Sequence, residues 1–197
     1  MMLRQLPLAW VVLAGCALTS KSAPLELRYF TPEVRDASVP QRRVTASHPR
    51  VRIGRISPGA LLRDRIMVRT SPVELSPYET LRWTEPPDRY VRRALVRTLF
   101  DDQPLAQAVG GAQPILDIEV LAFEEVPRRD GHRGRVVLRY ELHDDRDMLA
   151  AGTVAVERRA KSADISDVVA AIGQALDEAA QRIAIRVAAD VATPVPQ

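Results

Sequence analysis

Few residues in the chain have the type and spacing that catalysis or metal binding requires. The three histidines, His48, His132 and His143, show no H-E-x-x-H spacing. Residues 143–147, His-Asp-Asp-Arg-Asp, are the one group that resembles a site for a hard cation. Arg146 would lie among those ligands, and aspartates are typical of turns, so a polar turn is favoured there.

The remaining candidates for chemistry are also weak. Glu124 and Glu125 are neighbours on a predicted strand, so they point to opposite faces and cannot act together as an acid/base pair. Gly54 and Gly59 have the spacing of a phosphate-binding loop, but no Lys-Ser/Thr pair follows. We therefore expect a protein that is not an enzyme, with no catalytic residues, no metal and no cofactor.

The lone cysteine, Cys16, carries the strongest signal in the sequence. Residues 1–16 read MMLRQLPLAWVVLAGC, with Arg4 as the single charge and an apolar stretch too short to span a membrane stably. This pattern is typical of a secretory signal. Residues 13–16, Leu-Ala-Gly-Cys, resemble the lipobox of bacterial lipoproteins, which implies cleavage before Cys16 and acylation of its sulfur and its new amine. An ordinary signal peptide with an incidental cysteine is the alternative.

The lipobox divides the chain into a signal peptide (1–15), an acylated tether (16–24), a single domain (25–192) and a loose tail (193–197). Ala17 is not the aspartate that retains many enteric-type lipoproteins in the inner membrane. By that resemblance we expect an outer-membrane lipoprotein that faces the periplasm, with the inner membrane as the alternative.

Composition supports an ordinary folded domain. Of 197 residues, 46% are hydrophobic and 27% charged, with a formal net charge of +3. No apolar run reaches the ~18 residues of a membrane-spanning helix. Nearly all the basic residues are arginines interleaved with acids, so no concentrated basic patch indicates a nucleic-acid partner.

Hydrophobic periodicity predicts an α+β fold. Alternation or short apolar runs predict strands, and spacing of three and four residues predicts two amphipathic helices, one opened by residues 85–88 and one capped by Asp164. Gly54 interrupts an alternating strand, which indicates a bulge. The predicted strands are 25–31, 51–56, 65–69, 73–75, 80–83, 115–126, 135–143 and 149–159, with a loop at 101–114.

The last three of these strands are expected to form an antiparallel meander, because their connections carry turn residues. We expect an antiparallel or mixed sheet with both helices packed on one face.

A family resemblance lies in residues 65–99, RIMVRTSPVELSPYETLRWTEPPDRYVRRALVRTL. A strand leads through a tyrosine to a tryptophan, a proline and an amphipathic helix, and LDIEVLAFEEV with RVVLRYEL follows as a hairpin. This order resembles the ABC-type transport auxiliary lipoproteins, the paraquat-inducible protein C group. The matching positions are Ile66, Val68, Arg69, Thr70, Ser71, Tyr78, Trp83, Pro86, Leu95 and Leu99.

The resemblance implies a docking protein of an ABC system that moves lipids or other hydrophobic compounds across the envelope. Its implied partners are a mammalian-cell-entry (MCE) domain protein, an inner-membrane permease and an ATPase, and the membrane through the lipid anchor. It also implies a fold like the N-terminal domain of the Tol-system propeller protein, and it leaves homo-oligomer formation open.

The best candidate for a partner-binding surface is the arginine row, Arg89, Arg92, Arg93 and Arg97, on the polar side of the first helix. Arginine suits carboxylates and phosphates through its bidentate fork, although a solvated helix face is the favoured explanation of the row. Trp83 is expected either to lock that helix onto the sheet or to anchor a partner.

Three other functions remain open. The chain could be an outer-membrane assembly or lipopolysaccharide-export lipoprotein, or a structural envelope lipoprotein. It could also be an enzyme, which would require a pocket with convergent polar groups.

Overall fold

The computed structural model describes residues 25–33 and 48–192, so the predicted signal peptide, the tether with Cys16 and the tail lie outside the described residues. The elements in chain order are β1 (Arg28–Phe30), β2 (Arg50–Pro58), β3 (Arg65–Ser71), β4 (Glu74–Trp83), α1 (Pro87–Arg97), the π-helical turn η1 (Thr98–Asp102), β5 (Ala106–Gln107), β6 (Ile115–Arg128), β7 (Gly131–His143), β8 (Met148–Arg159) and α2 (Ile165–Ala192).

The strands form one mixed eight-stranded sheet built around β6. On one side of β6, β7 and then β8 pair in antiparallel fashion, which confirms the predicted meander. The other side of β6 is shared, because β2 pairs parallel to its first half and β3 pairs parallel to it at Glu124 and Glu125. β4 then pairs with β3, β1 with β4, and β5 with β2.

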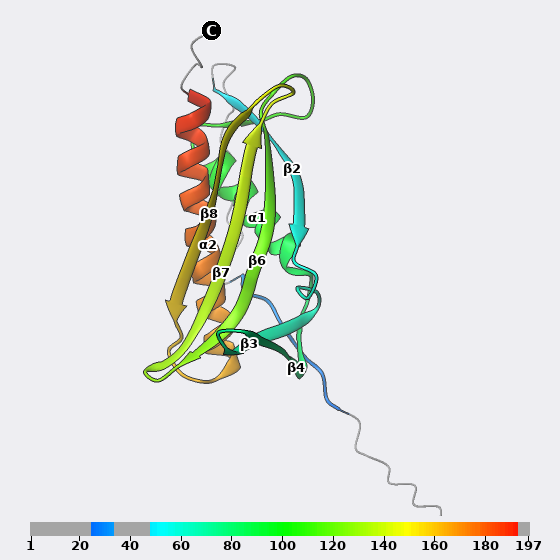
Figure 1. Ribbon diagram of the computed structural model, residues 1–197, viewed down its shortest axis with the longest axis vertical. Helices are drawn as coiled ribbons and strands as arrows, with labels where there is room; N and C mark the ends of the chain where they lie inside the picture. Colours follow the sequence, from blue (N-terminus) through cyan, green and yellow to red (C-terminus); the bar gives the residue numbers. More distant parts are fainter. Residues whose placement is uncertain (1–24, 34–47, 193–197) are drawn as a thin grey trace, which may run out of the picture.

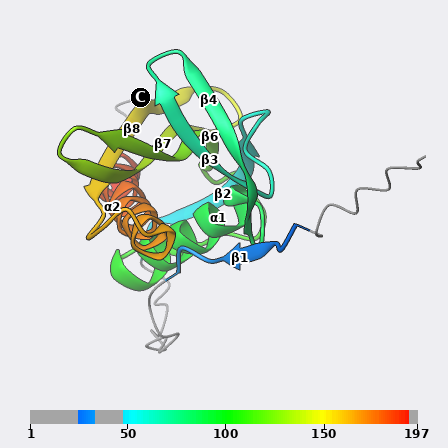
Figure 2. The same cartoon turned by 90° about the horizontal axis from the view of Figure 1, so that it is seen from below.

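Both helices cover the same face of the sheet, as predicted (Figures 1 and 2). α2 packs on β7 and β8, and α1 packs on β2 and β6 beside it. The apolar stripe of α2 is buried from Val168 to Val187, which gives a continuous core between helix and sheet. Asp164 caps α2, since its carboxylate accepts a hydrogen bond from the Ser166 N–H at 2.8 Å. None of the described helices is both long and apolar enough to cross a membrane.

Two segments differ from the expectation. The pieces predicted at 73–75 and 80–83 are one strand, β4, which continues through Pro77. Proline is tolerated there because β1 pairs with β4 only at Leu81–Trp83, so Pro77 lies where the second side of β4 is unpaired. The segment 101–114 is not wholly a loop, because η1 extends the first helix and β5 adds to β2.

The bulge predicted at Gly54 is confirmed. The register of β2 against β6 shifts between Ile53 and Ile56, and the Arg55 N–H donates to Oδ1 of Asp117 at 2.6 Å. A Cβ at Gly54 would lie 2.1 Å from that same oxygen, so only glycine fits.

Candidate partner-binding surface

Trp83 lies in the core at the junction of β4 and α1. Its side chain is 2% exposed, with its ring edge-on to Phe123 of β6 at 5.2 Å and to Tyr90 of α1 at 6.1 Å. The Tyr90 hydroxyl accepts a hydrogen bond from the Glu85 N–H at 3.0 Å, which ties the start of α1 to the same cluster. These contacts attach α1 to the sheet, and they leave almost none of the indole at the surface.

Arg93 is the most heavily engaged member of the arginine row. Its guanidinium forms ion pairs with Glu33 and Glu85, both at 2.6 Å, and lies 5.1 Å from the centre of the Tyr90 ring. The hydrogen bond to Glu33 is the main reason why the pKa of Arg93 is raised. Arg93 thus joins the segment after β1 to the start of α1.

Arg92 and Arg97 also have partners within the chain. Arg92 donates to the carbonyl oxygen of Gly54 at 2.9 Å, which supports the β2 bulge from the helix side. Arg97 bonds to Asp177 of α2 at 2.5 Å and so connects the two helices. Both side chains therefore contribute to the packing of α1.

Arg89 is the most exposed member of the row. Its side chain is 65% exposed, and its ion pair with the adjacent Asp88 is long, at 3.9 Å. Of the four arginines, Arg89 is the one that can change partners without breaking a contact between elements.

Two buried glutamates, Glu124 and Glu125, bind side chains from neighbouring strands, and these contacts were not predicted from the sequence. Glu124 is fully buried and receives two hydrogen bonds from Arg69 of β3, at 2.6 and 3.0 Å, and one from Arg135 of β7, at 3.3 Å. The hydrogen bond to Glu124 raises the pKa of Arg69 above its ordinary value. This ion-pair cluster holds β3 beside β6.

Glu125 points to the opposite face, as the strand alternation predicts, and binds a separate set of residues. Its carboxylate accepts a hydrogen bond from the Tyr78 hydroxyl of β4 at 2.5 Å and contacts Nδ1 of His132 in β7. Burial, and then the hydrogen bond to Glu125, raise the pKa of Tyr78 well above its usual range. The adjacent glutamates thus serve two clusters, and the signal for them in the sequence was a pair of carboxylates within the apolar run from Val120 to Val126.

Two open hollows lie on the described surface. One, of about 360 Å³, lies over the β2 bulge on the sheet face away from the helices and is lined by Arg55, Ser57, Asp117, Glu119, Arg139 and Glu141. Two of its carboxylates have partners there: Glu141 pairs with Arg139 at 2.9 Å, and Asp117 accepts a hydrogen bond from the Arg55 backbone N–H at 2.6 Å. A second, of about 460 Å³, lies between residues 58–64 and the start of α1.

The acidic segment 143–147 forms the β7–β8 turn. Asp144 Oδ1 accepts hydrogen bonds from the backbone N–H groups of Arg146 and Asp147, both at 2.8 Å, which is an Asx-type turn. Among residues 25–33 and 48–192, no three His, Cys, Asp or Glu side chains are placed to hold a metal ion.

Comparison with known families gives one match, which spans most of the chain. The family described as "ABC-type transport auxiliary lipoprotein component" matches residues 34–184. No curated protein matches the sequence.

Solved structures share the fold. A protein from Xanthomonas campestris is 23% identical, with a TM-score of 0.69 over 83% of this chain and 96% of that one. An uncharacterized protein is 17% identical, with a TM-score of 0.65 over 82% of this chain and 99% of that one. A hypothetical protein from Chlamydia trachomatis is 11% identical, with a TM-score of 0.52 over 74% and 98%.

Proposed function

The chain belongs to the ABC-type transport auxiliary lipoprotein family, and from that premise we propose that it acts by docking a partner rather than by turning over a substrate. The partner is an MCE-domain protein that works with an ABC permease and ATPase, and the cargo is a lipid or another hydrophobic compound. The chain is held at the outer membrane through Cys16 and faces the periplasm.

The family match carries this proposal, because it extends over residues 34–184 and so includes α1, strands β2 to β8 and most of α2. The described side chains support docking over catalysis. The buried carboxylate of Glu124 is held in ion pairs between strands, and in the hollow over the β2 bulge Arg139 is paired with Glu141.

The arginine row remains the proposed docking surface, with Arg89 as its most accessible member. Arg92, Arg93 and Arg97 contribute to the position of α1, and therefore to the shape of the surface that Arg89 presents. Reversing the charge of those three would also disturb packing, so Arg89 gives the cleaner test.

The test is a pull-down of the MCE-domain protein encoded beside this chain with the mature chain, residues 16–197, carrying Cys16→Ser. We expect a complex at micromolar concentrations, and its absence would overturn the partner assignment. Arg89→Glu should slow association several-fold, most strongly at low salt, because exposed interface charges act mainly on the association rate. Arg186→Glu, an exposed arginine on α2, is the matched control. Equal behaviour of the two variants would reject the arginine face and keep the partner.

The anchor has its own test. Cells that produce the wild-type chain should incorporate a fatty-acid probe, and Cys16→Ala should not. Ala17→Asp should move the protein to the inner-membrane fraction in an enteric-type host. Labelling of the Cys16→Ala variant would contradict acylation, and unchanged fractionation would contradict outer-membrane sorting.

The alternatives predict other partners. An assembly or lipopolysaccharide-export lipoprotein would bind the components of those machines, and a structural lipoprotein would bind none of the transport proteins. Homo-oligomer formation, and the likeness to the N-terminal domain of the Tol-system propeller protein, also remain proposals, which sedimentation and an experimental structure would test.

A further inference from the structure

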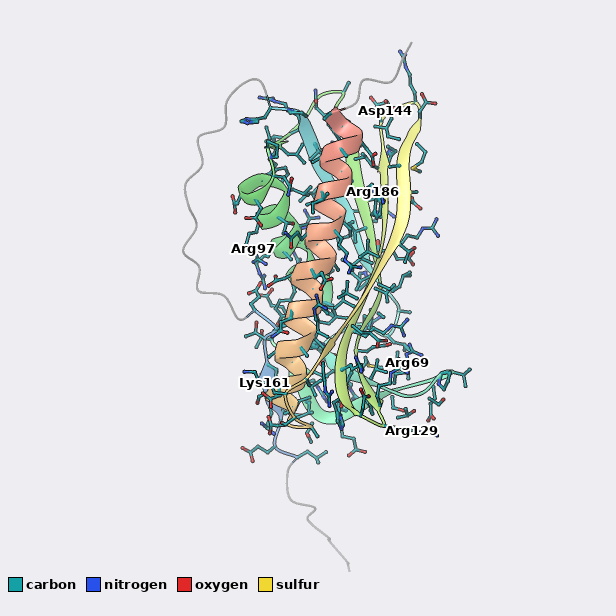
Figure 3. The ribbon with its side chains drawn as sticks, turned by 90° about the vertical axis from the view of Figure 1, so that its left-hand side faces the viewer. Arg69, Arg97, Arg129, Asp144, Lys161 and Arg186 are labelled. Carbon is teal, nitrogen blue, oxygen red and sulfur yellow. The ribbon has the colours of Figure 1, made fainter. Side chains whose placement is uncertain are left out.

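The turns at the two ends of the molecule carry opposite charge. At one end, the β6–β7 turn (127–133) reads Pro-Arg-Arg-Asp-Gly-His-Arg, and β8 finishes there at Arg158 and Arg159, followed by Lys161. At the other end, the β7–β8 turn contains Asp144, Asp145 and Asp147 with Arg146 as the single cation. Figure 3 shows Arg129 and Lys161 close to one end of the long axis and Asp144 near the other.

Several cations of the basic end are already neutralised. Arg128 pairs with Glu157 at 3.1 Å, Arg133 pairs with Asp130 at 2.7 Å, and Arg158 pairs with Glu178 of α2. The net charge of the end therefore depends on the groups outside these pairs.

Arg129, Arg159 and Lys161 are those remaining cations. All three are exposed, and within residues 25–33 and 48–192 none of them forms an ion pair with a carboxylate. Arg159 donates to the carbonyl oxygen of Asp130 at 2.5 Å, which fixes its direction and leaves its charge uncompensated by an ion pair. Two carboxylates at the start of α2 remain anionic beside this group: Asp164 accepts from the Ser166 N–H at 2.8 Å, and Asp167 accepts from the Ser162 hydroxyl at 2.6 Å. The three cations still outnumber them.

The described chain also begins at this basic end. Figure 1 shows the start of the described residues, in blue, at the end that carries the β6–β7 turn, while the C-terminal end of α2 lies at the opposite end. Nine residue steps separate Cys16 from Leu25, and a fully extended chain spans at most about 3.6 Å per residue. An acylated Cys16 therefore holds Leu25 within about 32 Å of the membrane. The 28-residue α2 is about 42 Å long, and its last residue lies at the end of the molecule away from Leu25.

We propose that the basic end, defined by Arg129, Arg159 and Lys161, contacts the anionic phosphate headgroups of the membrane that holds the anchor. The proposal rests on the proposed acylation of Cys16 for its geometry. The contact orients the long axis away from the membrane and directs the acidic β7–β8 turn into the periplasm. A domain tethered without this contact would have no preferred orientation.

The test uses vesicles and the mature chain with Cys16→Ser, so that no acyl group contributes to binding. We expect weak binding to phosphatidylcholine vesicles and clear binding when about a third of the lipid is phosphatidylglycerol, because each basic residue at such a surface strengthens binding about fivefold. The binding should fall as salt is raised. Equal binding to both kinds of vesicle would overturn the proposal.

Charge reversal locates the surface. Arg129→Glu with Lys161→Glu should weaken binding to the anionic vesicles at least about 25-fold. Arg146→Glu with Arg186→Glu changes the net charge equally toward the other end. It should change binding less than about twofold, because Arg186 lies 21 residues of α2, about 31 Å, from the start of that helix, which is several Debye lengths. Equal losses in the two variants would show that vesicle binding depends only on the net charge of the protein. That result would overturn the assignment of the contact to the basic end.

Two controls separate the possible failures. Arg129→Gln with Lys161→Gln replaces the reversed pair if circular dichroism shows that the reversed pair unfolds the domain, and it should still weaken binding severalfold. The vesicle assay needs neither acylation nor an MCE partner. Loss of labelling at Cys16 or of the pull-down would therefore refute the proposed function and leave the headgroup contact to be decided by the vesicles.

Discussion

The carboxylate of Glu124 is fully buried, whereas its partners Arg69 and Arg135 keep 24% and 32% of their side chains exposed. Removing one of these arginines should therefore lower the free energy of unfolding more than neutralising the Glu124 carboxylate does. Arg69→Met leaves Glu124 with one contact at 3.3 Å, and should lower the free energy of unfolding by about 3 kcal/mol. Glu124→Gln leaves two arginines that water can still reach, and should cost about 1–2 kcal/mol. Urea denaturation of both variants measures the difference, and the reverse order would contradict this account.

Trp83 offers a second asymmetry at the scale of one residue. Its buried indole Nε1 has no hydrogen-bond partner in the described structure. Trp83→Phe should cost only about 1–2 kcal/mol, because the lost volume is partly offset by removal of an unpaired polar group. Trp83→Ala should cost about 3–5 kcal/mol through the cavity it leaves. Thermal unfolding followed by circular dichroism tests both. A Trp83→Ala variant with normal stability but without partner binding would instead indicate an interface role.

Between elements, α2 approaches β7 closely at Gly134. A Cβ at this position would lie 2.2 Å from the backbone nitrogen of Ile172, and backbone cannot move aside as a flexible side chain can. Gly134→Ala should push α2 away from the sheet and cost about 3 kcal/mol or more. Gly110→Ala is the control, since nothing lies within 4 Å of its Cβ position. Chemical denaturation that gave both variants equal stability would contradict the close packing.

The elements that were predicted well are those whose contacts are local in sequence. The strands β6, β7 and β8 follow one another with short turns, and the stripe and the cap of α2 are visible in its own residues. The parallel pairings of β2 and β3 with β6 were not predicted, because nothing in either segment specifies a partner some 60 residues away. The continuity of β4 was missed for the same reason, since its neighbours determine whether Pro77 is tolerated.

At the scale of the molecule, the residue types in the sequence indicated the candidate surface, but only the fold shows which residues those side chains bind. The arginine row is on α1 as expected, yet the partners of Arg92, Arg93 and Arg97 come from β2, from residues 33 and 85, and from α2. The same limit applied to Glu124 and Glu125, whose opposite directions were predicted and whose partners were not. Likewise, the charge polarity depends on which turns share an end, and therefore on the topology.

The core that joins all these parts should make the domain unfold as one unit. Residues of β6, α1 and α2 belong to a single buried cluster, whose members run in sequence from Val51 to Val187. The mature chain has one tryptophan, Trp83, because Trp10 precedes Cys16. Fluorescence therefore reports the α1–β6 junction, whereas far-ultraviolet circular dichroism is dominated by α2, the longest helix. We expect the two signals to give the same urea midpoint, as two-state unfolding requires. An earlier fluorescence transition would show that α1 and its arginine row detach while α2 remains on the sheet, and α1 would then be the element free to rearrange on docking.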